Sequence, residues 1–256
     1  MTIENNATVV RFEKLPDCLF RIWIRPDWSC EGLQWSPGQF LRIGVLNPGD
    51  SKNALRAMTI ITISDNVLEF FMVSITEGVT SPKLATLSAG DRCYVEALIT
   101  GNFHTATLPA ATGRDLWMMG TGTGIAPYLA MLKHSKQPLS DFRSLVLVHS
   151  VQHPQHLCYQ TELAKAAEFY DDLLYVPVVT KATNNTDDRL HQRLPMLIAN
   201  SQLSAFTGKD LTPQQSVVML CGHPGMIRDA TTQLKALGLT KHRRRAPGNI
   251  LTERYF

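Results

Sequence analysis

The second half of the chain alternates short apolar runs with longer amphipathic segments, and this alternation restricts the fold more than any other feature. The apolar runs have the length and composition of strands, and they lie at 116–120, 144–150, 173–181 and 216–222. Segments with helical spacing follow them at 125–134, 159–170, 193–201 and 224–238. Strands that are apolar on both faces are typical of a parallel sheet covered by helices on both sides. We therefore predict a doubly wound α/β domain over residues 113–256.

The first hundred residues follow a different rhythm. Short stretches rich in β-branched and aromatic residues alternate with Pro, Gly, Asp and Asn, a pattern typical of a barrel or sandwich. These stretches lie at 7–15, 18–26, 39–47, 56–64, 67–75 and 91–99. One helix is predicted over 81–90, with Ser81 as its N-cap, Pro82 in its first turn and Gly90 at its end. We predict an antiparallel β-barrel over residues 1–101, joined to the α/β domain by 102–112.

The composition is that of a globular protein and argues against several functions. Of the 256 residues, 44% are hydrophobic and 18% are charged, so a core can form. A net charge of +3 is too small to indicate nucleic-acid binding. The five cysteines contain no CxxC pair, which argues against a disulfide framework or a bound metal and favours a reducing cytoplasm. With neither a signal peptide nor an apolar run of about 18 residues, we expect a soluble, cytoplasmic monomer without membrane contact.

A glycine-rich turn separates the first strand of the α/β domain from its helix. The stretch WMMGTGTGIAPYLAMLKH, residues 117–134, contains Gly120, Gly122 and Gly124. Ligands of parallel sheets bind at the carboxyl ends of the strands, where glycines let backbone N–H groups approach a pyrophosphate. Thr121 and Thr123 add hydroxyl groups. The spacing matches neither GxGxxG nor a P-loop. A tight turn without a ligand is the alternative, and the domain context favours a nucleotide.

A second predicted strand also ends at a glycine. Cys221 and Gly222 follow an apolar run, and Pro224, Gly225 and Met226 open the next helix. Two glycine-bearing strand ends in one sheet can hold an elongated ligand from two sides. Packing is the alternative explanation for a Cys-Gly pair taken by itself.

Over nearly its whole length the sequence resembles the ferredoxin/flavodoxin–NADP⁺ reductases, specifically their bacterial subclass. Five motifs occur in that family's order and spacing: PGQF at 37–40, RAMT at 56–59, GTGTGIAP at 120–127, VMLCGHPGMIRD at 218–229 and KHRRRAPGNILTERYF at 241–256. The resemblance implies an FAD-binding β-barrel followed by an NADP-binding α/β domain. This is the same architecture that the two rhythms of the sequence predict.

The resemblance implies a set of flavin contacts in the first domain. Arg56 corresponds to the arginine at the FAD pyrophosphate, a role suited to its fork of donors. Thr59 corresponds to the hydroxyl residue near flavin N5, and Met58 replaces the family's aromatic residue on the flavin ring. Tyr255 and Phe256 correspond to a terminal aromatic pair, of which the last residue packs on the adenine. The implied FAD-binding residues are Arg56, Ala57, Met58, Thr59, Phe71, Met72, Val73, Thr80, Ser81, Pro82, Thr123, Tyr255 and Phe256.

The resemblance also implies NADP(H) contacts in the second domain. A 2′-phosphate needs positive charge, which Lys181 and Arg193 offer. Gln152 stands where the family has a further arginine, so discrimination against NADH is expected to be looser. The implied NADP-binding residues are Gly120, Thr121, Gly122, Thr123, Gly124, Gln152, Lys181, Arg193, Cys221, Gly222 and Met226. Solvated side chains are the alternative for Lys181 and Arg193.

The implied reaction is hydride transfer from NADPH to flavin N5, followed by single-electron transfer to ferredoxin or flavodoxin. Thr59, Cys221 and Glu253 are the implied catalytic positions, with Cys221 beside the nicotinamide. The basic segment KHRRR, residues 241–245, is a candidate docking face for an acidic redox protein and is expected near the flavin side. A solvated basic cluster is the alternative.

Three other functions remain open at this point. A reductase component of an oxygenase would share both domains, although many of these carry a fused [2Fe–2S] module whose cysteine spacing is missing here. A regulatory relative without flavin is a second alternative, and Met58 is the feature that favours it. An NADPH oxidase or ferric reductase without a protein acceptor is the third.

Overall fold

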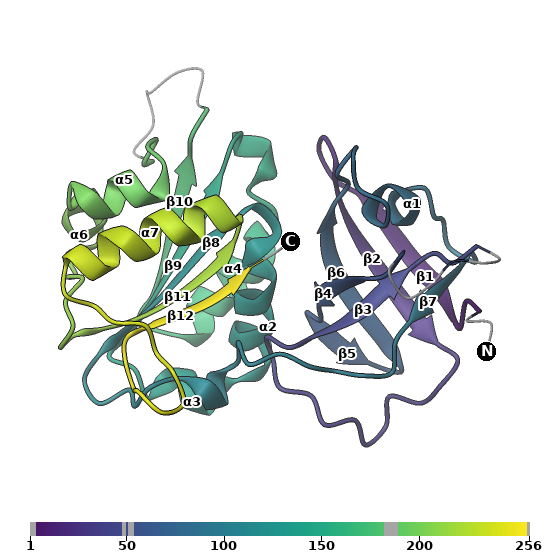
Figure 1. Ribbon diagram of the computed structural model, residues 1–256, viewed down its shortest axis with the longest axis horizontal. Coiled ribbons are helices and arrows are strands. Elements are labelled where there is room, and N and C mark those ends of the chain that lie inside the picture. Colours follow the sequence, from purple (N-terminus) through teal and green to yellow (C-terminus); the bar gives the residue numbers. More distant parts are fainter. Residues whose placement is uncertain (1–3, 48–49, 51–53, 182–188, 255–256) are drawn as a thin grey trace. The chain divides into compact units, whose positions relative to one another are not determined.

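The computed structural model describes residues 4–47, 50, 54–181 and 189–254. The chain separates into two compact units, which span residues 1–104 and 105–256 (Figure 1). The first unit is built on an antiparallel sheet, and the second is a parallel sheet covered by helices.

The first unit contains a seven-stranded sheet with the order β4-β3-β7-β1-β2-β6-β5. Its strands are β1 (Ala7–Lys14), β2 (Leu19–Pro26), β3 (Phe40–Gly44), β4 (Arg56–Thr59), β5 (Thr62–Ser64), β6 (Val67–Val73) and β7 (Arg92–Val95). All of its strand pairs are antiparallel. Inward-facing residues alternate along the strands, so that Val9, Ile22, Ile24 and Phe70 are completely buried in one shared core.

The predicted strand 56–64 forms two strands, because the chain changes partners at Ile60 and Ile61. The Ile60 N–H donates to the Gln39 carbonyl at 3.1 Å, next to β3. The Ile61 N–H donates to the Glu69 carbonyl of β6 at 2.9 Å. The two edge strands of the sheet, β4 and β5, are therefore consecutive in the sequence, and within the described residues no ladder pairs them with each other.

Helix α1 is shorter than predicted and begins differently. It spans Ser81–Ala85 with Thr80 in the N-cap position, so Ser81 is not the cap. The Ser81 hydroxyl instead accepts a hydrogen bond from the Ile75 N–H at 3.0 Å. Gly90 does not end the helix, since it lies five residues beyond Ala85 at φ +97° and its N–H donates to the Val9 carbonyl at 2.8 Å.

The second unit contains a five-stranded parallel sheet with the order β10-β9-β8-β11-β12. Its strands are β8 (Asp115–Thr121), β9 (Ser144–Val151), β10 (Leu173–Val179), β11 (Ser216–Gly222) and β12 (Ile250–Arg254). The α-helices are α2 (Ala126–His134), α3 (Lys136–Ser140), α4 (Gln160–Phe169), α5 (Leu194–Ala199), α6 (Gln202–Thr207) and α7 (Pro224–Ala236). Short 3₁₀ turns occur at Thr105–Thr107, Gly122–Ile125 and Pro154–His156.

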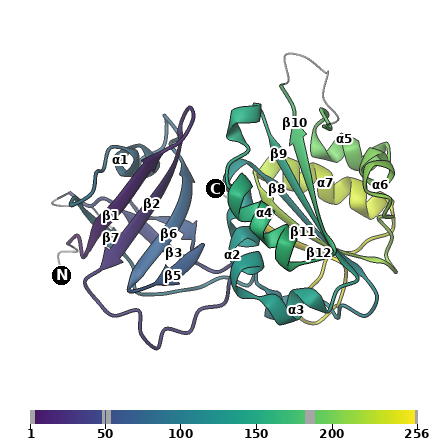
Figure 2. The ribbon, with the colours of Figure 1, turned by 180° about the vertical axis from the view of Figure 1, so that it is seen from behind.

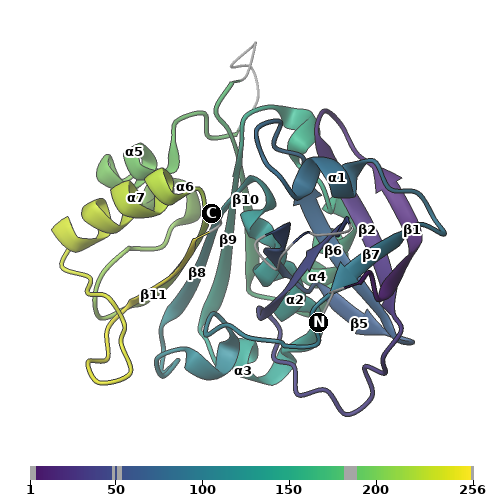
Figure 3. The same cartoon turned by 45° about the vertical axis from the view of Figure 1, so that its right-hand side comes forward.

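Helices cover both faces of this sheet, as the apolar strands predicted. Figure 1 shows α5, α6 and α7 on one face, and Figure 2, seen from behind, shows α2, α3 and α4 on the other. Trp117, Val148 and Leu220 pack with Leu197 of α5 and Leu234 of α7 in one core, and the sheet stands between the two helical layers in Figure 3. This doubly wound arrangement confirms the predicted fold class.

Several short elements were not predicted. Helices α3 and α6 have five and six residues, too few to produce a helical pattern in the sequence. Strand β12 pairs in parallel with β11 and places residues 250–254 at the edge of the sheet. In the sequence this segment was recognised only through the family motif that contains it.

Candidate functional site

The strand order places a topological switch point between β8 and β11. These strands are neighbours in the sheet, and the helices that follow them, α2 and α7, lie on opposite faces (Figures 1 and 2). In open α/β sheets, ligands bind in the crevice beyond the carboxyl ends of such strands. The two glycine-bearing turns predicted from the sequence, at 120–124 and 221–225, both lie at this point.

Three of the predicted glycines allow close backbone contacts, Gly124 and Gly222 between the two strand ends and Gly120 within the first turn. A Cβ at Gly124 would lie 2.6 Å from the Cys221 carbonyl oxygen, and one at Gly120 would lie 2.9 Å from the Gly124 carbonyl oxygen. Gly222 has φ +127°, and a Cβ there would collide with Thr121. Gly122 differs, because it has φ +54° and a Cβ there would meet nothing within 4 Å. The sequence suggested that the glycines leave room for a phosphate, and open space of that kind is present at Gly122.

Hydrogen bonds fix the second turn against the first. The His223 N–H donates to the Thr121 hydroxyl at 3.1 Å. His223 also caps α7, since its Nδ1 accepts from the Gly225 N–H at 3.1 Å. Thr123, buried in the 3₁₀ turn, and half-buried Met226, which packs against the core of the unit, complete this region.

A single row of residues crosses the sheet at its carboxyl end. The strand register pairs Pro177 with His149, His149 with Gly120, Gly120 with Cys221, and Cys221 with Glu253. Laterally paired residues of parallel strands point to the same face. The predicted catalytic positions Cys221 and Glu253 are therefore side-by-side neighbours, with the side-chain-free Gly120 next to them.

Burial shifts the pKa values of two residues of this row, His149 and Glu253, toward their uncharged forms. Burial lowers the pKa of His149 to about 4, despite its hydrogen bond to the Gly122 carbonyl. Burial raises the pKa of Glu253 to about 8. Within the described part of the chain, the buried Glu253 Oε2 has no hydrogen-bond partner. A buried polar atom without a partner is costly and is a common sign of a binding or catalytic role.

His149 and Tyr175 were missed by the sequence analysis. The His149 Nε2 lies 3.0 Å from the Gly122 carbonyl oxygen, and its Nδ1 lies 3.5 Å from the Tyr175 hydroxyl. Both residues sit inside apolar runs that were interpreted as core strands. A histidine within an almost wholly apolar run was the available signal.

The residues predicted to recognise a 2′-phosphate lie near the ends of β9 and β10. The Lys181 N–H donates to the Gln152 carbonyl at 2.8 Å, so these two exposed residues are neighbours. Arg193 is exposed at the N-cap of α5. His191 holds its segment against β10, with Nδ1 3.1 Å from the Val179 carbonyl oxygen. All three predicted side chains therefore lie toward the same end of the sheet.

In the first unit, the predicted flavin residues on β4 range from exposed to buried. Arg56 and Ala57 are exposed, Met58 is half-buried against the core, and Thr59 is buried. The Thr80 hydroxyl donates to the Ala54 carbonyl at 2.6 Å. This bond brings the start of α1, including Ser81 and Pro82, beside the start of β4.

The remaining flavin residues are divided between β6 and the chain terminus. Phe71 and Met72 are buried and Val73 is half-buried at the end of β6, and β6 also contacts β4. The structure thus brings the three predicted segments of this unit, 56–59, 71–73 and 80–82, into one region. Tyr255 and Phe256 lie outside the described residues.

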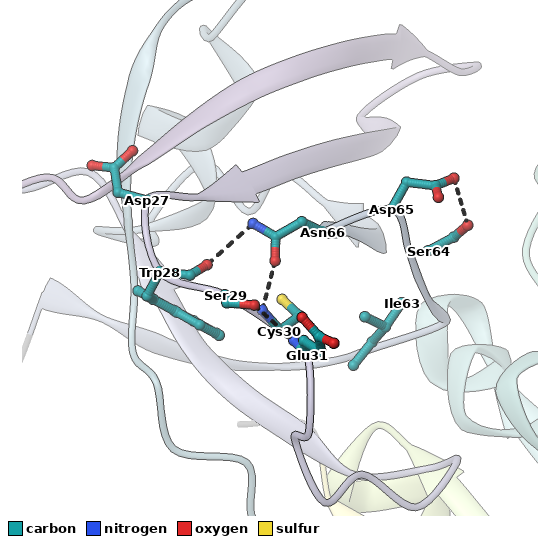
Figure 4. A pocket seen from close by; sticks show the side chains of 9 residues that line it. All are labelled: Asp27, Trp28, Ser29, Cys30, Glu31, Ile63, Ser64, Asp65 and Asn66. Atoms are coloured by element: carbon teal, nitrogen blue, oxygen red, sulfur yellow. Dashed lines mark hydrogen bonds between the residues drawn. The ribbon is translucent and has the colours of Figure 1, made fainter.

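A separate pocket of about 530 Å³ opens in the first unit, between the loop after β2 and the turn from β5 to β6 (Figure 4). Asn66 organises it, because its side chain accepts from the Cys30 N–H at 2.6 Å and donates to the Trp28 carbonyl at 3.1 Å. None of the predicted site residues that the structure describes lines this pocket.

The basic segment 241–245 lies at the amino end of the parallel sheet, and its predicted place near the flavin side stays a prediction. It precedes β12, and the Lys241–Ile250 bridge holds it at the amino end of the sheet. Glu253 lies at the opposite, carboxyl end, because β12 runs along the sheet between them (Figure 1). The basic segment and Glu253 are therefore separated along the strand, since five residues of a strand span about 17 Å.

The described part of the chain contains neither a cluster of metal ligands nor a membrane-spanning helix. It contains no cluster of three or more His, Cys, Asp or Glu side chains suited to a metal ion. Within the same residues, no helix is long and apolar enough to cross a membrane.

Comparison with known proteins agrees with this geometry. Residues 118–232 match the oxidoreductase NAD-binding domain family. The sequence is 33% identical to the flavodoxin/ferredoxin–NADP reductase of Escherichia coli (strain K12) over 86% of each chain. It is 31% identical to the enzyme of that name from Buchnera aphidicola subsp. Baizongia pistaciae over 98% of each chain. The structure resembles a crystal structure of a ferredoxin NADP⁺ reductase from Neisseria gonorrhoeae with bound FAD and NADP, with a TM-score of 0.85, 30% identity and 98% coverage of both chains.

The antiparallel sheet, the doubly wound unit and the strand-end site define an oxidoreductase with an NAD-binding domain. Within that class, the chain belongs to the flavodoxin/ferredoxin–NADP reductase family. The suspected family resemblance is therefore confirmed.

Proposed function

We propose that this protein binds FAD in its first unit and NADP(H) in its second, and that it carries electrons between NADPH and a ferredoxin or flavodoxin. Family membership supports this function. The observation in the structure that carries it is the switch point itself, where open space beside Gly122 lies near the row Gly120–Cys221–Glu253 and where, among the described residues, the buried Oε2 of Glu253 has no hydrogen-bond partner. The free cysteines are consistent with a cytoplasmic protein, and we propose a monomer.

The second unit fits a dinucleotide. Space beside Gly122 suits a pyrophosphate, and Thr121, Thr123, Gly124, Gly222 and Met226 shape the surrounding turns. Lys181 and Arg193 supply the positive charge that favours a 2′-phosphate, and Gln152 contributes only a neutral amide. This set favours NADPH over NADH by less than a full set of cations would.

The first unit fits a flavin dinucleotide. Exposed Arg56 suits the pyrophosphate, and the backbone of 71–73 and the 80–82 turn complete the binding region. Ala57 and Met58 would adjoin the flavin, with Met58 offering a soft thioether contact. When bound, FAD supplies hydride acceptance and one-electron chemistry. Tyr255 and Phe256 are proposed contacts of its adenine.

The residues of the chain have distinct tasks in this reaction. Thr59 is proposed to hydrogen bond near flavin N5, and buried Cys221 to shape the surface under the nicotinamide. Glu253 would hold a proton at its carboxyl group below pH about 8 and donate a hydrogen bond from it. We expect the rate of reduction by NADPH to fall as the pH rises through about 8, and Glu253→Gln to abolish this dependence.

The experiment that tests the proposed function is anaerobic stopped-flow reduction of the purified protein. We expect bound FAD, fast bleaching by NADPH and slower bleaching by NADH, followed by reoxidation by ferredoxin or flavodoxin. Equal rates with the two nucleotides would contradict the role of Lys181 and Arg193. A protein that refuses added FAD would contradict the function itself and favour a regulatory relative.

A matched pair of arginine variants tests the flavin site. Arg56→Ala should lower FAD occupancy after gel filtration by about tenfold, because a charge-assisted contact to the pyrophosphate is lost. Arg25→Ala removes another exposed arginine of the same sheet, on β2, and should leave occupancy unchanged. Equal losses in both variants would point to general destabilisation instead of a specific contact.

A further inference from the structure

The His149 ring is buried directly beneath the glycine-rich turn. It has no exposed surface, and its Nε2 lies 3.0 Å from the Gly122 carbonyl oxygen. A carbonyl oxygen only accepts hydrogen bonds, so Nε2 carries the proton and donates it to Gly122. This contact links β9 to the turn after β8, across 27 positions of the sequence.

The other side of the ring faces a tyrosine. With Nε2 protonated in a neutral ring, Nδ1 is an acceptor, and the Tyr175 hydroxyl lies 3.5 Å away. Gln160, in the first turn of α4, donates to the same hydroxyl oxygen at 3.1 Å. Tyr175 and Gln160 thus support the ring from the side opposite Gly122. Burial keeps the ring neutral at the pH of the cell.

Gly122 needs such an anchor more than other residues of the turn. Its φ of +54° is accessible to glycine at little cost. No atom lies within 4 Å of the point where a Cβ would stand, so packing does not hold this residue in place. The planar trans peptide between Gly122 and Thr123 points its carbonyl and its N–H in opposite directions. While His149 holds the carbonyl on the side of the sheet, the Thr123 N–H is therefore directed away from His149.

We propose that His149 is a positioning residue, which fixes the Gly122–Thr123 peptide so that its N–H is presented to the pyrophosphate of a bound dinucleotide. This inference rests on the proposed function, because it assumes that the turn binds NADP(H). His149 itself does not touch the nucleotide. Its contribution is to remove in advance the conformational freedom that the glycine-rich turn would otherwise lose on binding.

The test compares variants of the FAD-loaded holoenzyme by calorimetric titration with NADP⁺ and by steady-state kinetics with NADPH. His149→Leu should weaken NADP⁺ binding and raise KM about tenfold, with kcat changed less than about twofold. His149→Gln keeps an N–H donor near the Nε2 position and should recover most of the affinity. Tyr175→Phe removes only the support of the ring and should have a smaller effect of the same kind.

Leu147→Ala is the matched control, since Leu147 is buried on the same strand and the same face, two residues before His149. It should lower thermal stability and leave the affinity for NADP⁺ unchanged. Equal weakening in Leu147→Ala and His149→Leu would overturn the inference, as would wild-type affinity in His149→Leu. If His149→Leu does not fold, the other two variants decide: unaltered affinity for NADP⁺ in Tyr175→Phe, or a loss of affinity of about tenfold in His149→Gln, would overturn it.

A spectroscopic measurement follows the peptide directly. In the ¹⁵N-labelled holoenzyme, the Thr123 amide signal should shift on addition of NADP⁺ in the wild type and in His149→Gln, and shift much less in His149→Leu. An identical shift in all three proteins would contradict the role of His149. Failure of the wild type to bind NADP⁺ at all would instead contradict the proposed function, so the two failures are distinguishable.

Discussion

The two ends of the parallel sheet differ in the charge and the hydrogen bonding of their buried polar side chains. At the amino end, the register places Asp115 between Ser144 and Ser216. Burial by itself would raise the pKa of Asp115, but hydrogen bonds from Arg143 at 2.9 Å and Ser144 at 2.6 Å outweigh it and lower the pKa. At the carboxyl end, His149 and Glu253 occupy a comparable row in uncharged form, and Glu253 keeps an unpartnered oxygen among the described residues.

This difference separates stability from function within one sheet. A buried charge with all of its hydrogen bonds contributes to the fold and has no capacity left for a ligand. A buried carboxyl without a partner reduces stability, and a ligand that contacts it can restore the lost interaction. We therefore expect substitutions at the amino end to change stability alone, and those at the carboxyl end to change nucleotide binding.

The largest expected effect comes from Arg143→Ala. It would leave the fully buried Asp115 carboxylate with Ser144 as its remaining side-chain donor, at a loss of about 3 kcal/mol in the free energy of unfolding. Denaturant titration measures this loss. Arg228→Ala is the control, because it removes an ion pair with Asp229 in which both side chains are exposed. It should change the free energy of unfolding by less than about 0.5 kcal/mol. A large change in KM for NADPH in Arg143→Ala would contradict the proposal that the amino end affects stability alone.

An acid-dependent loss of stability should come from His149. Its pKa in the folded protein, about 4, lies below the unfolded value of 6.5, so the unfolded chain binds more protons below pH 6.5. Stability is therefore complete above that pH and declines as the pH falls toward 4. Between pH 7.5 and pH 5 the ring should account for about 2 kcal/mol of this decline.

The effect of Glu253 has the opposite sign and must be separated from that of His149. Its folded pKa of about 8 lies above its unfolded value of 4.5, so its contribution to stability falls as the pH rises between these values. The difference between wild type and His149→Gln, taken at each pH, isolates the ring. A difference that is constant from pH 5 to pH 7.5 would show that the ring titrates normally in the folded protein.

A pair of glycine variants should resolve two kinds of glycine within the turn. Gly124→Ala would place a methyl group 2.6 Å from a backbone oxygen that cannot move aside easily, whereas Gly122→Ala meets open space and only the strain of a positive φ. We expect Gly124→Ala to be less stable than Gly122→Ala by about 1.5 kcal/mol. Thermal unfolding of both variants provides the comparison, and equal melting temperatures would contradict it.

The fold was predictable to the extent that burial leaves a pattern in the sequence. Strands buried on both faces, such as 144–150, are visible as apolar runs, and the helices between them follow from spacing. Strand β12 was missed because it is short and three of its five residues are polar, so that its pairing with β11 decides its conformation. The split between β4 and β5 depended on two backbone hydrogen bonds to different strands, which no local pattern encodes.

The site was predictable at its turns and unpredictable across its strands. Gly120, Gly122 and Gly124 mark a strand end through their sequence alone. The row from His149 to Glu253 requires the strand order and register, because its members are separated by up to 133 positions along the chain, from Gly120 to Glu253. A histidine within an apolar run could mark His149 as unusual, but its role could not be predicted, since its partner is a backbone carbonyl that any residue possesses.

The smallest expected effect tests whether added positive charge changes the preference for NADPH over NADH only at the carboxyl end of the sheet. Gln152→Arg places a guanidinium beside Lys181, at the position where the family has an arginine, and should increase the preference for NADPH over NADH about fivefold, equivalent to about 1 kcal/mol. Gln215→Arg adds the same charge at an exposed residue next to Asp115, at the amino end. The ratio of kcat/KM for the two nucleotides should stay unchanged in that variant. If both variants shift the ratio equally, long-range attraction explains the effect, and the two ends of the sheet do not differ in their contact with the nucleotide.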